Sequence, residues 1–484
     1  MAQTHAIVVG GSFSGLAAAR VLSEFFDRVT VLDRDHFPDG PEDRAGVPQA
    51  RHVHGLLVRG LAEYEQLFPG FERLAIDKGA TFHDHTLDFV VLRPQGWQAR
   101  YPSGLKFLSA SRELIESCIR ELFRRIPNAE LRERTAVTGL RISHRDGPRC
   151  VGVTIPAGGR GHSETLEADL VVDASGSVSR APAWLADAGL RPPAETVVDP
   201  LAGYASRWFQ GPPAEKWPED WWWWAGAYIR RRPDDLVEAN FQLKEHNRWH
   251  LTLSGFNRRY PPTHEREFMA MLPRLRSPLI AEMTRLMEPD SPVYANRAIR
   301  NRWRHYERWK QRCDGFIAIG DAYVTYNPVY AQGMTAAALS AQMLRTCLAR
   351  HAASDSELPR AYHSAQAAIQ RDPWMLSAGV DLRFPFTTGE KPLSIRIFNH
   401  YLDGIGLAAR EHETVRRCLV EVAQLIRPLS DFFQPGIVAR VGLATARYEI
   451  RQIKRAILRE TALPIPSMPP KASNARDIAQ QAAA

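Results

Sequence analysis

The sequence predicts an α/β protein in which a Rossmann-like unit is combined with an inserted, mostly antiparallel β-sheet and a C-terminal helical region. Three observations predict this fold class. Residues 6–35 follow the order strand, glycine-rich turn, helix, strand. Residues 185–295 change to short alternating strands among Trp and Pro residues, as at 249–253. From residue 358 onward the pattern of apolar residues is mostly helical.

The individual elements follow in chain order. Residues 6–9 and 28–32 are short apolar or β-branched runs, which predict strands, and 17–26 is a compact helical run. Residues 36–50 are rich in Pro, Gly and Asp and predict a loop. Apolar residues at helical spacing predict helices over 53–68 and 111–125, the second with Ser111 as its N-cap. The remaining predicted elements are strands at 151–155, 166–172 and 315–320 and a helix at 334–348.

The composition excludes several classes of protein. With 484 residues, 44% hydrophobic and 24% charged, the chain is typical of soluble globular proteins with two or three packed lobes. No run reaches the roughly 18 apolar residues of a transmembrane segment, and a strand at residue 6 leaves no room for a secretory signal. Five scattered cysteines without a CxxC pair argue against a disulfide framework or a metal site and favour the cytoplasm. They are Cys118, Cys150, Cys313, Cys347 and Cys418.

The net charge of +8 has an ordinary explanation. Arginines gather at 230–232 and 297–308, but two aspartates follow the first stretch and aromatic and acidic residues are interleaved with the second, as on a solvated surface. No nucleic-acid-binding motif accompanies them, so we expect no nucleic-acid partner. Part of the positive charge is expected to complement an anionic cofactor.

The first candidate site is a phosphate-binding loop between the strand at 6–9 and the following helix. It consists of Gly10, Gly11, Ser12, Phe13, Ser14 and Gly15. A pyrophosphate needs backbone amides at a helix N-terminus with no side chain in the way, and the glycines provide this. Ser12 replaces the second glycine of the usual motif. Asp33 closes the second strand, where an acid binds adenosine ribose hydroxyls, so the segment predicts dinucleotide binding.

A second candidate segment lies far along the chain. The buried strand at 315–320 ends in Gly320-Asp321, and 327–334 leads into a helix of small residues. A carboxylate at a strand end can bind ribityl hydroxyls, and a helix N-terminus can face the flavin pyrimidine, where reduction leaves negative charge. Together with the phosphate loop, this segment selects FAD over NAD.

A third segment, 169–176 followed by Ser179-Arg180, predicts a strand running into a glycine turn beside the cofactor.

The three segments, in this order, resemble the FAD-dependent monooxygenases of the aromatic-hydroxylase fold. In detail the chain is most similar to an actinobacterial group that includes the polyether epoxidases for monensin and lasalocid. The general flavin motifs are widely shared, whereas the blocks at 46–54 and 327–330 are the specific ones. The matching stretches, which span residues 6 to about 385, are 31–35, 44–54, 67–70, 110–112, 173–176, 179–180, 327–330, 332–334 and 372–374.

The resemblance implies a role for each matching cofactor residue and a domain organisation. Asp33, with Arg34 beside it, would bind the ribose, Arg112 the pyrophosphate or ribityl chain, and Asp321 the ribityl chain. Gln332, Gly333 and Met334 would approach the flavin ring, and Pro328 and Arg51 would contribute to the cofactor site. His52 and His54 are more simply explained as part of a structured loop, and no catalytic residue is assigned.

We expect a discontinuous Rossmann-like FAD-binding domain of the glutathione-reductase type over 1–80, 105–185 and 296–350. A β-sheet substrate domain would take 81–104 and 186–295, a helical region 351–463, and a flexible tail 464–484.

Two departures from the family pattern bear on function. Ala331 stands where relatives have glycine, and we expect the site to survive this change. Ser175 stands where single-component aromatic hydroxylases have an aspartate linked to the cofactor and NADPH. We therefore expect a separate NAD(P)H flavin reductase to supply the electrons.

The resemblance implies an epoxidase. Reduced flavin and O2 would form a C4a-hydroperoxide, which donates oxygen to an alkene of a hydrophobic polyketide or terpenoid intermediate. Aromatic residues of the 185–295 sheet, Trp208, Phe241 and Trp249, would line the substrate site together with Tyr330, although ordinary core packing explains the sheet aromatics equally well.

Several alternatives stay open on this fold. They are an aromatic hydroxylase, an isoprenoid double-bond reductase, a non-catalytic FAD-binding protein and a flavin-dependent halogenase. The run Trp221–Trp224 invites the last comparison, but Ala225-Gly226 follows it in place of the halogenase Ile-Pro.

Overall fold

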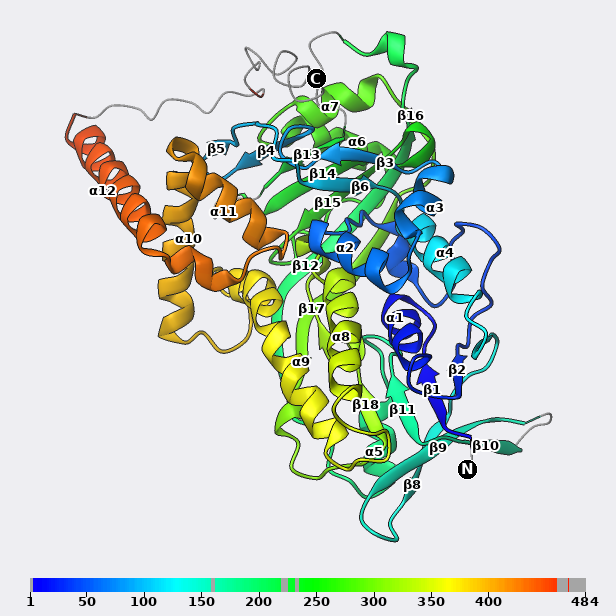
Figure 1. Ribbon diagram of the computed structural model, residues 1–484. Helices are drawn as coiled ribbons and strands as arrows, with labels where there is room; N and C mark the ends of the chain where they lie inside the picture. The colour runs from blue at the N-terminus through cyan, green and yellow to red at the C-terminus, as the bar shows by residue number, and fades with distance from the viewer. Residues whose placement is uncertain (1–2, 158–161, 219–224, 231–234, 459–468, 470–484) are drawn as a thin grey trace.

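The computed structural model describes residues 3–157, 162–218, 225–230, 235–458 and 469. Two sheets form the body of the molecule, and the C-terminal helices pack beside them (Figure 1). The predicted α/β class, with a parallel sheet and a mostly antiparallel one, is confirmed. The Trp221–Trp224 run and all but one residue of the 464–484 tail lie outside the described residues.

The smaller sheet has five strands in the order β18-β11-β1-β2-β7, and all of its pairs are parallel. Its apolar runs are buried on both faces, as expected for a parallel sheet between two layers. The strands are β1 (His5–Val9), β2 (Arg28–Leu32), β7 (Ala129–Arg132), β11 (Leu170–Asp173) and β18 (Phe316–Ala318). The carboxyl ends of β1, β2 and β18 lead directly into the predicted cofactor segments.

Helices cover one face of this sheet and a small sheet covers the other. The helical layer contains α1 (Phe13–Leu22), α4 (Arg112–Phe123) and α8 (Gly333–Leu348), with α2 (Val58–Leu67) and α3 (Phe71–Asp77) packed against it. The opposite layer contains β8 (Gly139–Ser143), β9 (Arg149–Pro156), β10 (Ser163–Glu167) and α5 (Ala181–Asp187). Ser111 caps α4 as predicted, because its Oγ accepts a hydrogen bond from the Leu114 amide at 3.1 Å.

The larger sheet has nine strands in the order β19-β17-β12-β15-β14-β13-β4-β5, with β16 paired to β12. Its pairs are antiparallel except β4 with β13, where Leu92 lies opposite Ile229. The strands are β4 (Phe89–Arg93), β5 (Gly96–Trp97), β12 (Glu195–Gln210), β13 (Gly226–Ile229), β14 (Val237–Leu243), β15 (Arg248–Gly255), β16 (Glu288–Pro289), β17 (Tyr294–Arg304) and β19 (Val324–Thr325). A separate hairpin-like pair joins β3 (Thr81–Asp84) to β6 (Lys106–Ser109).

The two faces of the larger sheet differ in polarity. Side chains alternate between faces along a strand, so Trp249, Leu251 and Leu253 of β15 share one face. That face packs on α6 (Glu265–Met271) and α7 (Leu279–Arg285) and forms a closed apolar core. The other face carries polar residues such as Thr252 and Ser254, and these line a cavity.

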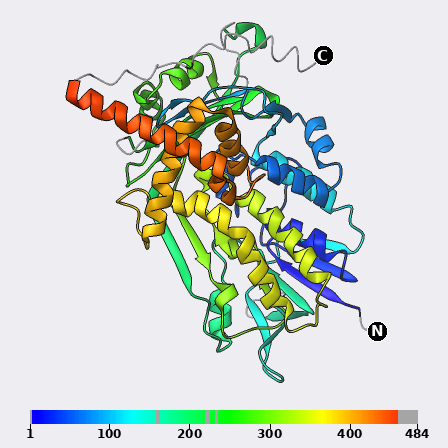
Figure 2. The same ribbon diagram turned by 60° about the vertical axis from the view of Figure 1, so that its left-hand side comes forward.

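The C-terminal region is helical from residue 358. It contains α9 (Leu358–Trp374), the π-helical turn η8 (Met375–Gly379), α10 (Leu393–Glu411), α11 (Glu413–Ala423) and α12 (Pro435–Leu458). Figure 2 shows α12 lying across the other C-terminal helices. In the portion of the chain that the structure describes, no helix has both the length and the apolar character to cross a membrane. All five cysteines are buried free thiols.

Candidate active site

The phosphate loop connects the end of β1 to the start of α1. Gly10 has a φ of 106°, and a Cβ there would lie 2.5 Å from the carbonyl oxygen of Ala174. A Cβ on Gly15 would overlap the carbonyl oxygen of Gly10. Both positions therefore require glycine, and the first turn of α1 stays open to a ligand at its N-terminus.

Asp33 lies at the end of β2, next to this loop. Its carboxylate accepts hydrogen bonds from the amides of Gly11 at 2.7 Å and Asp35 at 2.8 Å. Arg34 beside it is exposed. The acid therefore lies next to the phosphate loop, at the strand end where a ribose-binding acid is expected.

A buried ion network joins the phosphate loop to α4. Arg112 donates to Ser12 Oγ at 2.9 Å and pairs with Glu116 at 2.9 Å, and Ser12 Oγ donates to Glu116 at 2.8 Å. Glu116 also pairs with Arg44 at 2.7 Å, and Arg44 reaches Asp35 at 3.1 Å. Arg44 and Glu116 were not predicted. Only Glu116 has a signal in the sequence, because its spacing of four residues from Arg112 puts both on one face of a helix.

The second predicted segment lies against the phosphate loop. Gly320 has a φ of 61°, and a Cβ there would overlap Ser14 Oγ, so residues far apart in sequence meet here. The backbone oxygen of Asp321 accepts from Thr325 Oγ1 at 3.0 Å. Its carboxylate accepts no hydrogen bond from any residue in the described parts of the chain. Burial raises the pKa of Asp321 to about 6, although Arg112 and Arg304 oppose the rise.

A short turn, η7 (Pro328–Tyr330), precedes α8 and lines the cavity. Asn327 Nδ2 donates to Asp381 at 2.9 Å, and Tyr330 Oη donates to the same carboxylate at 2.7 Å. Asp381, which follows η8, was not predicted, and it holds the turn from the C-terminal region. Ala331 adopts the left-handed conformation at φ 55°, which explains why glycine suits this position in relatives.

The start of α8 offers a buried polar atom to a ligand. Gln332 is buried at the cavity wall, and its Nε2 donates to the Tyr330 carbonyl at 2.9 Å. Its Oε1 has no hydrogen-bond partner among the described residues. Met334 is buried behind the turn, and its carbonyl accepts from Tyr64 Oη at 3.2 Å. An orphaned oxygen at a helix start requires a donor from a ligand or from water.

The third predicted segment, 169–176 with Ser179 and Arg180, is held by hydrogen bonds among its own residues. Ser175 Oγ and Ser179 Oγ both donate to the buried Asp173, each at 2.5 Å. Gly10 approaches Ala174 and Ser175 closely, so the segment does border the phosphate loop. Ser175 brings no charge to this border.

The loop at 48–55 is fastened to the larger sheet. His52 Nδ1 lies 2.8 Å from Ser206 Oγ, and Lys244 Nζ donates to the carbonyl oxygens of His54 and Ala110 at 2.8 and 3.0 Å. Burial lowers the pKa of His52 to about 4 and that of His54 to about 3. Both histidines are therefore uncharged at neutral pH and serve as parts of a structured loop. Arg51 points outward and pairs with Asp43 at 2.9 Å.

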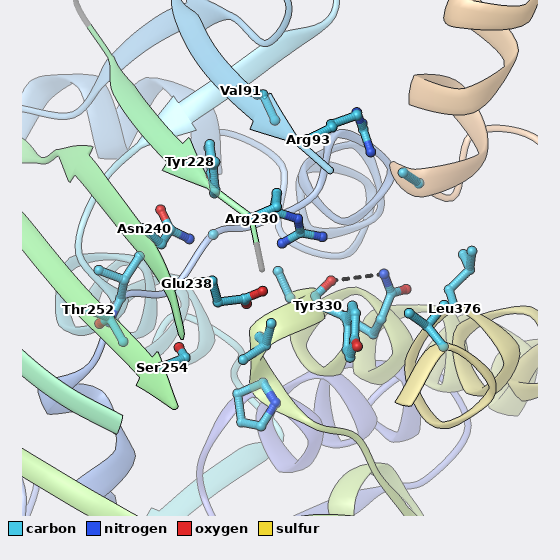
Figure 3. A pocket seen from close by; sticks show the side chains of 18 of the residues that line it. Val91, Arg93, Tyr228, Arg230, Glu238, Asn240, Thr252, Ser254, Tyr330 and Leu376 are labelled. Atoms are coloured by element: carbon cyan, nitrogen blue, oxygen red, sulfur yellow. Dashed lines mark hydrogen bonds between the residues drawn. The ribbon is translucent and has the colours of Figure 1, made fainter. Parts of the chain in front are cut away.

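A cavity of about 330 Å³ lies between the polar face of the larger sheet, the η7 turn and the C-terminal helices (Figure 3). Tyr330, which was predicted to contact the substrate, lines this cavity. Phe241 and Trp249 do not, because strand alternation turns them to the opposite face and into the apolar core. Trp208 stacks on His250 at 3.8 Å between ring centroids and is also absent from the cavity wall. The residues that do line it are polar on the sheet side and largely apolar on the helical side. They include Tyr204, Tyr228, Asn240, Thr252, Leu376, Val380, Phe384 and Leu402.

These features fit a bound FAD. The phosphate loop and Arg112 offer donors to a pyrophosphate, and Asp33 offers an acceptor to the ribose. Asp321 offers an acceptor to ribityl hydroxyls, which would supply its missing donors. Gln332 Oε1 and the start of α8 would meet the polar edge of the flavin where the cavity reaches η7.

FAD affinity should rise with pH through the titration of Asp321. Without ligand, the carboxyl is protonated below about pH 6. Ribityl hydroxyls prefer the charged form, so binding expels a proton and weakens as the pH falls. We expect binding about tenfold weaker at pH 5 than at pH 7.5, measured by flavin fluorescence. The variant Asp321→Asn should bind weakly with a flat profile, and an equal slope in both proteins would contradict the assignment.

No known protein-family model matches the chain. "Protein Rv3254" of Mycobacterium tuberculosis (strain ATCC 25618 / H37Rv) is 34% identical over 403 residues, which cover 80% of this chain and 82% of that protein. The flavin-dependent brominase Bmp2 has a TM-score of 0.64 and 13% identity, covering 93% of this chain and 100% of its own. PqsL, a probable FAD-dependent monooxygenase from Pseudomonas aeruginosa, has a TM-score of 0.58 and 16% identity, covering 79% and 97%. The chain therefore shares the fold of Bmp2 and PqsL.

Proposed function

The chain belongs to the protein family of Mycobacterium tuberculosis Protein Rv3254, and we propose that it acts as an FAD-dependent monooxygenase. One observation carries this proposal. Ser14 of the phosphate loop lies against Gly320, the Asp321 carboxylate lies beside Gly333 at the start of α8, and Gln332 at that start lines a cavity whose opposite wall is the larger sheet. A flavin held by the phosphate loop, Asp321 and the start of α8 would present its ring to a substrate in the cavity.

Bound FAD, once reduced, would supply the activation of O2 for oxygen transfer. The chain's own residues would position the ring and the substrate and limit access of water. Tyr330 and Gln332 would hold the turn at the ring, with Asp381 fixing Tyr330 from behind. The apolar side chains of the C-terminal helices would cover the substrate and exclude water.

Among oxygen-transfer reactions we favour epoxidation of an alkene, which needs no strong base. The histidines that line the cavity are weak bases, because burial lowers the pKa of His52, His54 and His85 to about 4 or below. Deprotonation of a phenol, as in aromatic hydroxylases, would be poorly served by them. The resemblance of the blocks at 46–54 and 327–330 to polyether epoxidases supports a polyketide or terpenoid substrate.

Halogenation is less well supported. Flavin-dependent halogenases use a catalytic lysine. The candidate here is Lys244, a buried lysine that directly follows β14, but it does not line the cavity. Its ammonium already donates to two carbonyl oxygens and to Gln242 Oε1 at 2.9 Å. A lysine engaged in this way is better explained as an anchor of the 48–55 loop than as a catalytic group.

Electrons should come from a separate reductase, since Ser175 brings no charge to the cofactor border. The purified, FAD-loaded protein should oxidise NADPH only at background rate. With a flavin reductase, a linear polyene substrate and 18O2, it should form an epoxide that carries one 18O, detected by mass spectrometry. The same mixture without the chain is the control. Rapid NADPH oxidation by the chain alone would refute the need for a separate reductase. An unlabelled or absent epoxide would refute epoxidation as the reaction.

A further inference from the structure

We propose that Arg93 and Arg230 form a carboxylate-binding subsite in the cavity, so that the substrate is an elongated apolar acid. The inference rests on the proposed function only in taking the cavity as the substrate site. Nothing in the sequence motifs pointed to these two residues. The proposal follows from their position in the sheet, their missing partners and the apolar walls beside them.

The sheet places the two arginines side by side. Arg93 is the last residue of β4, and Arg230 directly follows β13. These two strands pair in parallel, with Leu92 opposite Ile229, so the two arginines follow directly after paired residues. Arg230 also donates its amide to the Leu92 carbonyl at 2.9 Å. Both side chains line the cavity, and Figure 3 shows the two guanidinium groups reaching into it.

A third arginine fixes the strand ends from behind. Arg276 donates to the carbonyl oxygen of Arg230 at 2.8 Å and to that of Arg93 at 3.1 Å. Because one guanidinium holds both backbones, the spacing between the two strand ends is set before any ligand arrives. Such preorganisation lowers the cost of binding.

Among the described residues, neither Arg93 nor Arg230 has a carboxylate partner. Arg93 Nε donates to Gln98 Oε1 at 2.8 Å, and no ion pair reaches Arg93 or Arg230 within the described ranges. By contrast, Arg383 in the same cavity already pairs with Asp403 at 2.9 Å. Burial and the charge of Arg230 lower the pKa of Arg93 to about 10, as expected for two cations held together without an anion.

One acidic side chain does face this region. Glu238 of β14 lines the cavity near Arg230, but it pairs with neither arginine and has an interaction of its own. The nearby His85 is uncharged at neutral pH, because burial lowers its pKa to about 4. Positive charge therefore exceeds negative charge at this end of β4 and β13.

A carboxylate is the anion that suits the site. Guanidinium groups bind planar carboxylates through paired hydrogen bonds, and two of them would neutralise a buried anion. The adjoining wall is apolar, with Val91, Leu376, Val380 and Leu402 among its residues. A ligand with one acid group and an apolar chain would thus match the cavity, and its chain would extend along the wall that includes the η7 turn.

Calorimetry on the full-length, FAD-loaded chain tests the subsite with three probes that share the same number of carbon atoms. They are octanoate, octan-1-ol and octyl phosphate. We expect octanoate to bind at least about tenfold more tightly than the alcohol and more tightly than the phosphate. The single variants Arg93→Gln and Arg230→Gln should each reduce the preference for the acid to less than about threefold. Arg383→Gln, which removes a cavity arginine that is already paired, should retain it.

Equal binding of octanoate and octan-1-ol by the unaltered protein would overturn the proposal, as would a preference that survives both substitutions. Tighter binding of octyl phosphate would overturn the choice of a carboxylate. Flavin content, read from absorbance of the same preparation, separates the two proposals. A chain that holds no FAD but still prefers octanoate would refute the oxygenase and support the subsite. A chain with FAD and oxygenase activity but no acid preference would refute the subsite alone.

Discussion

Replacing Gly15 with alanine should yield a chain that no longer retains FAD. The added methyl group would overlap the carbonyl oxygen of Gly10, which is backbone and cannot rotate away. Gly10 itself abuts Ala174, so the turn cannot retreat without displacing the end of β11. We expect FAD binding at least about 100-fold weaker, equivalent to about 2.8 kcal/mol, measured by flavin fluorescence during titration.

Gly442→Ala is the matched control for this change. Gly442 also lies within a helix, but nothing lies within 4 Å of its added Cβ. Alanine there should stabilise α12 by about 1 kcal/mol and leave FAD binding unchanged, because alanine is the better helix former. Normal FAD binding by the Gly15 variant would mean that the loop does not cradle a pyrophosphate.

Glu116→Gln should destabilise the folded protein by about 3 kcal/mol or more. Glu116 is only 4% exposed and lies between the guanidinium groups of Arg112 and Arg44. Removing its charge leaves two buried cations with less compensation, which is costlier than losing an exposed pair. Arg112 and Ser12 also lose a common anchor, so FAD retention should fall together with the melting temperature. Thermal unfolding and flavin content measure the two effects.

Glu121→Gln provides the comparison on the same helix. Glu121 also contacts two cations, Lys78 at 3.1 Å and Arg125 at 2.7 Å, but its side chain is 40% exposed. Water screens these pairs, so the loss should stay within about 1 kcal/mol. Equal losses for the two variants would show that the network around Glu116 contributes no more than surface charge.

The sequence predicted the cofactor segments because each combines a strand end, a glycine and a polar residue at fixed spacing. Their convergence, with Gly320 against Ser14, follows from parallel strands whose carboxyl ends share one edge. Arg44 and Asp381 were not predicted, because no local sequence pattern marks them. Each joins its partners only through tertiary contacts, and a lone charged residue in a loop or after a helix gives no periodic signal.

The misplaced aromatics had a signal that could have been used. In β15 the residues Trp249, Leu251 and Leu253 alternate with His250, Thr252 and Ser254. A strand with one apolar and one polar face places its tryptophan with the leucines, in the core. The polar face, which holds Thr252 and Ser254, is the one that meets the cavity. The position of a residue on one or the other face of its strand, rather than its aromatic character, is therefore the better guide to the cavity wall.

The interleaved strand order constrains when the chain can acquire its cofactor during synthesis. β1 and β2 emerge first, but their sheet is completed by β11 and then by β18 at Phe316–Ala318. Asp321 and the start of α8 emerge later still. A ribosome-bound chain shorter than this lacks Asp321 and the start of α8, to which we assign part of the flavin site, so we expect tight capture only after about two thirds of the protein has been translated. A yellow preparation, which contains bound flavin, would therefore contain chains in which these distant segments have already come together.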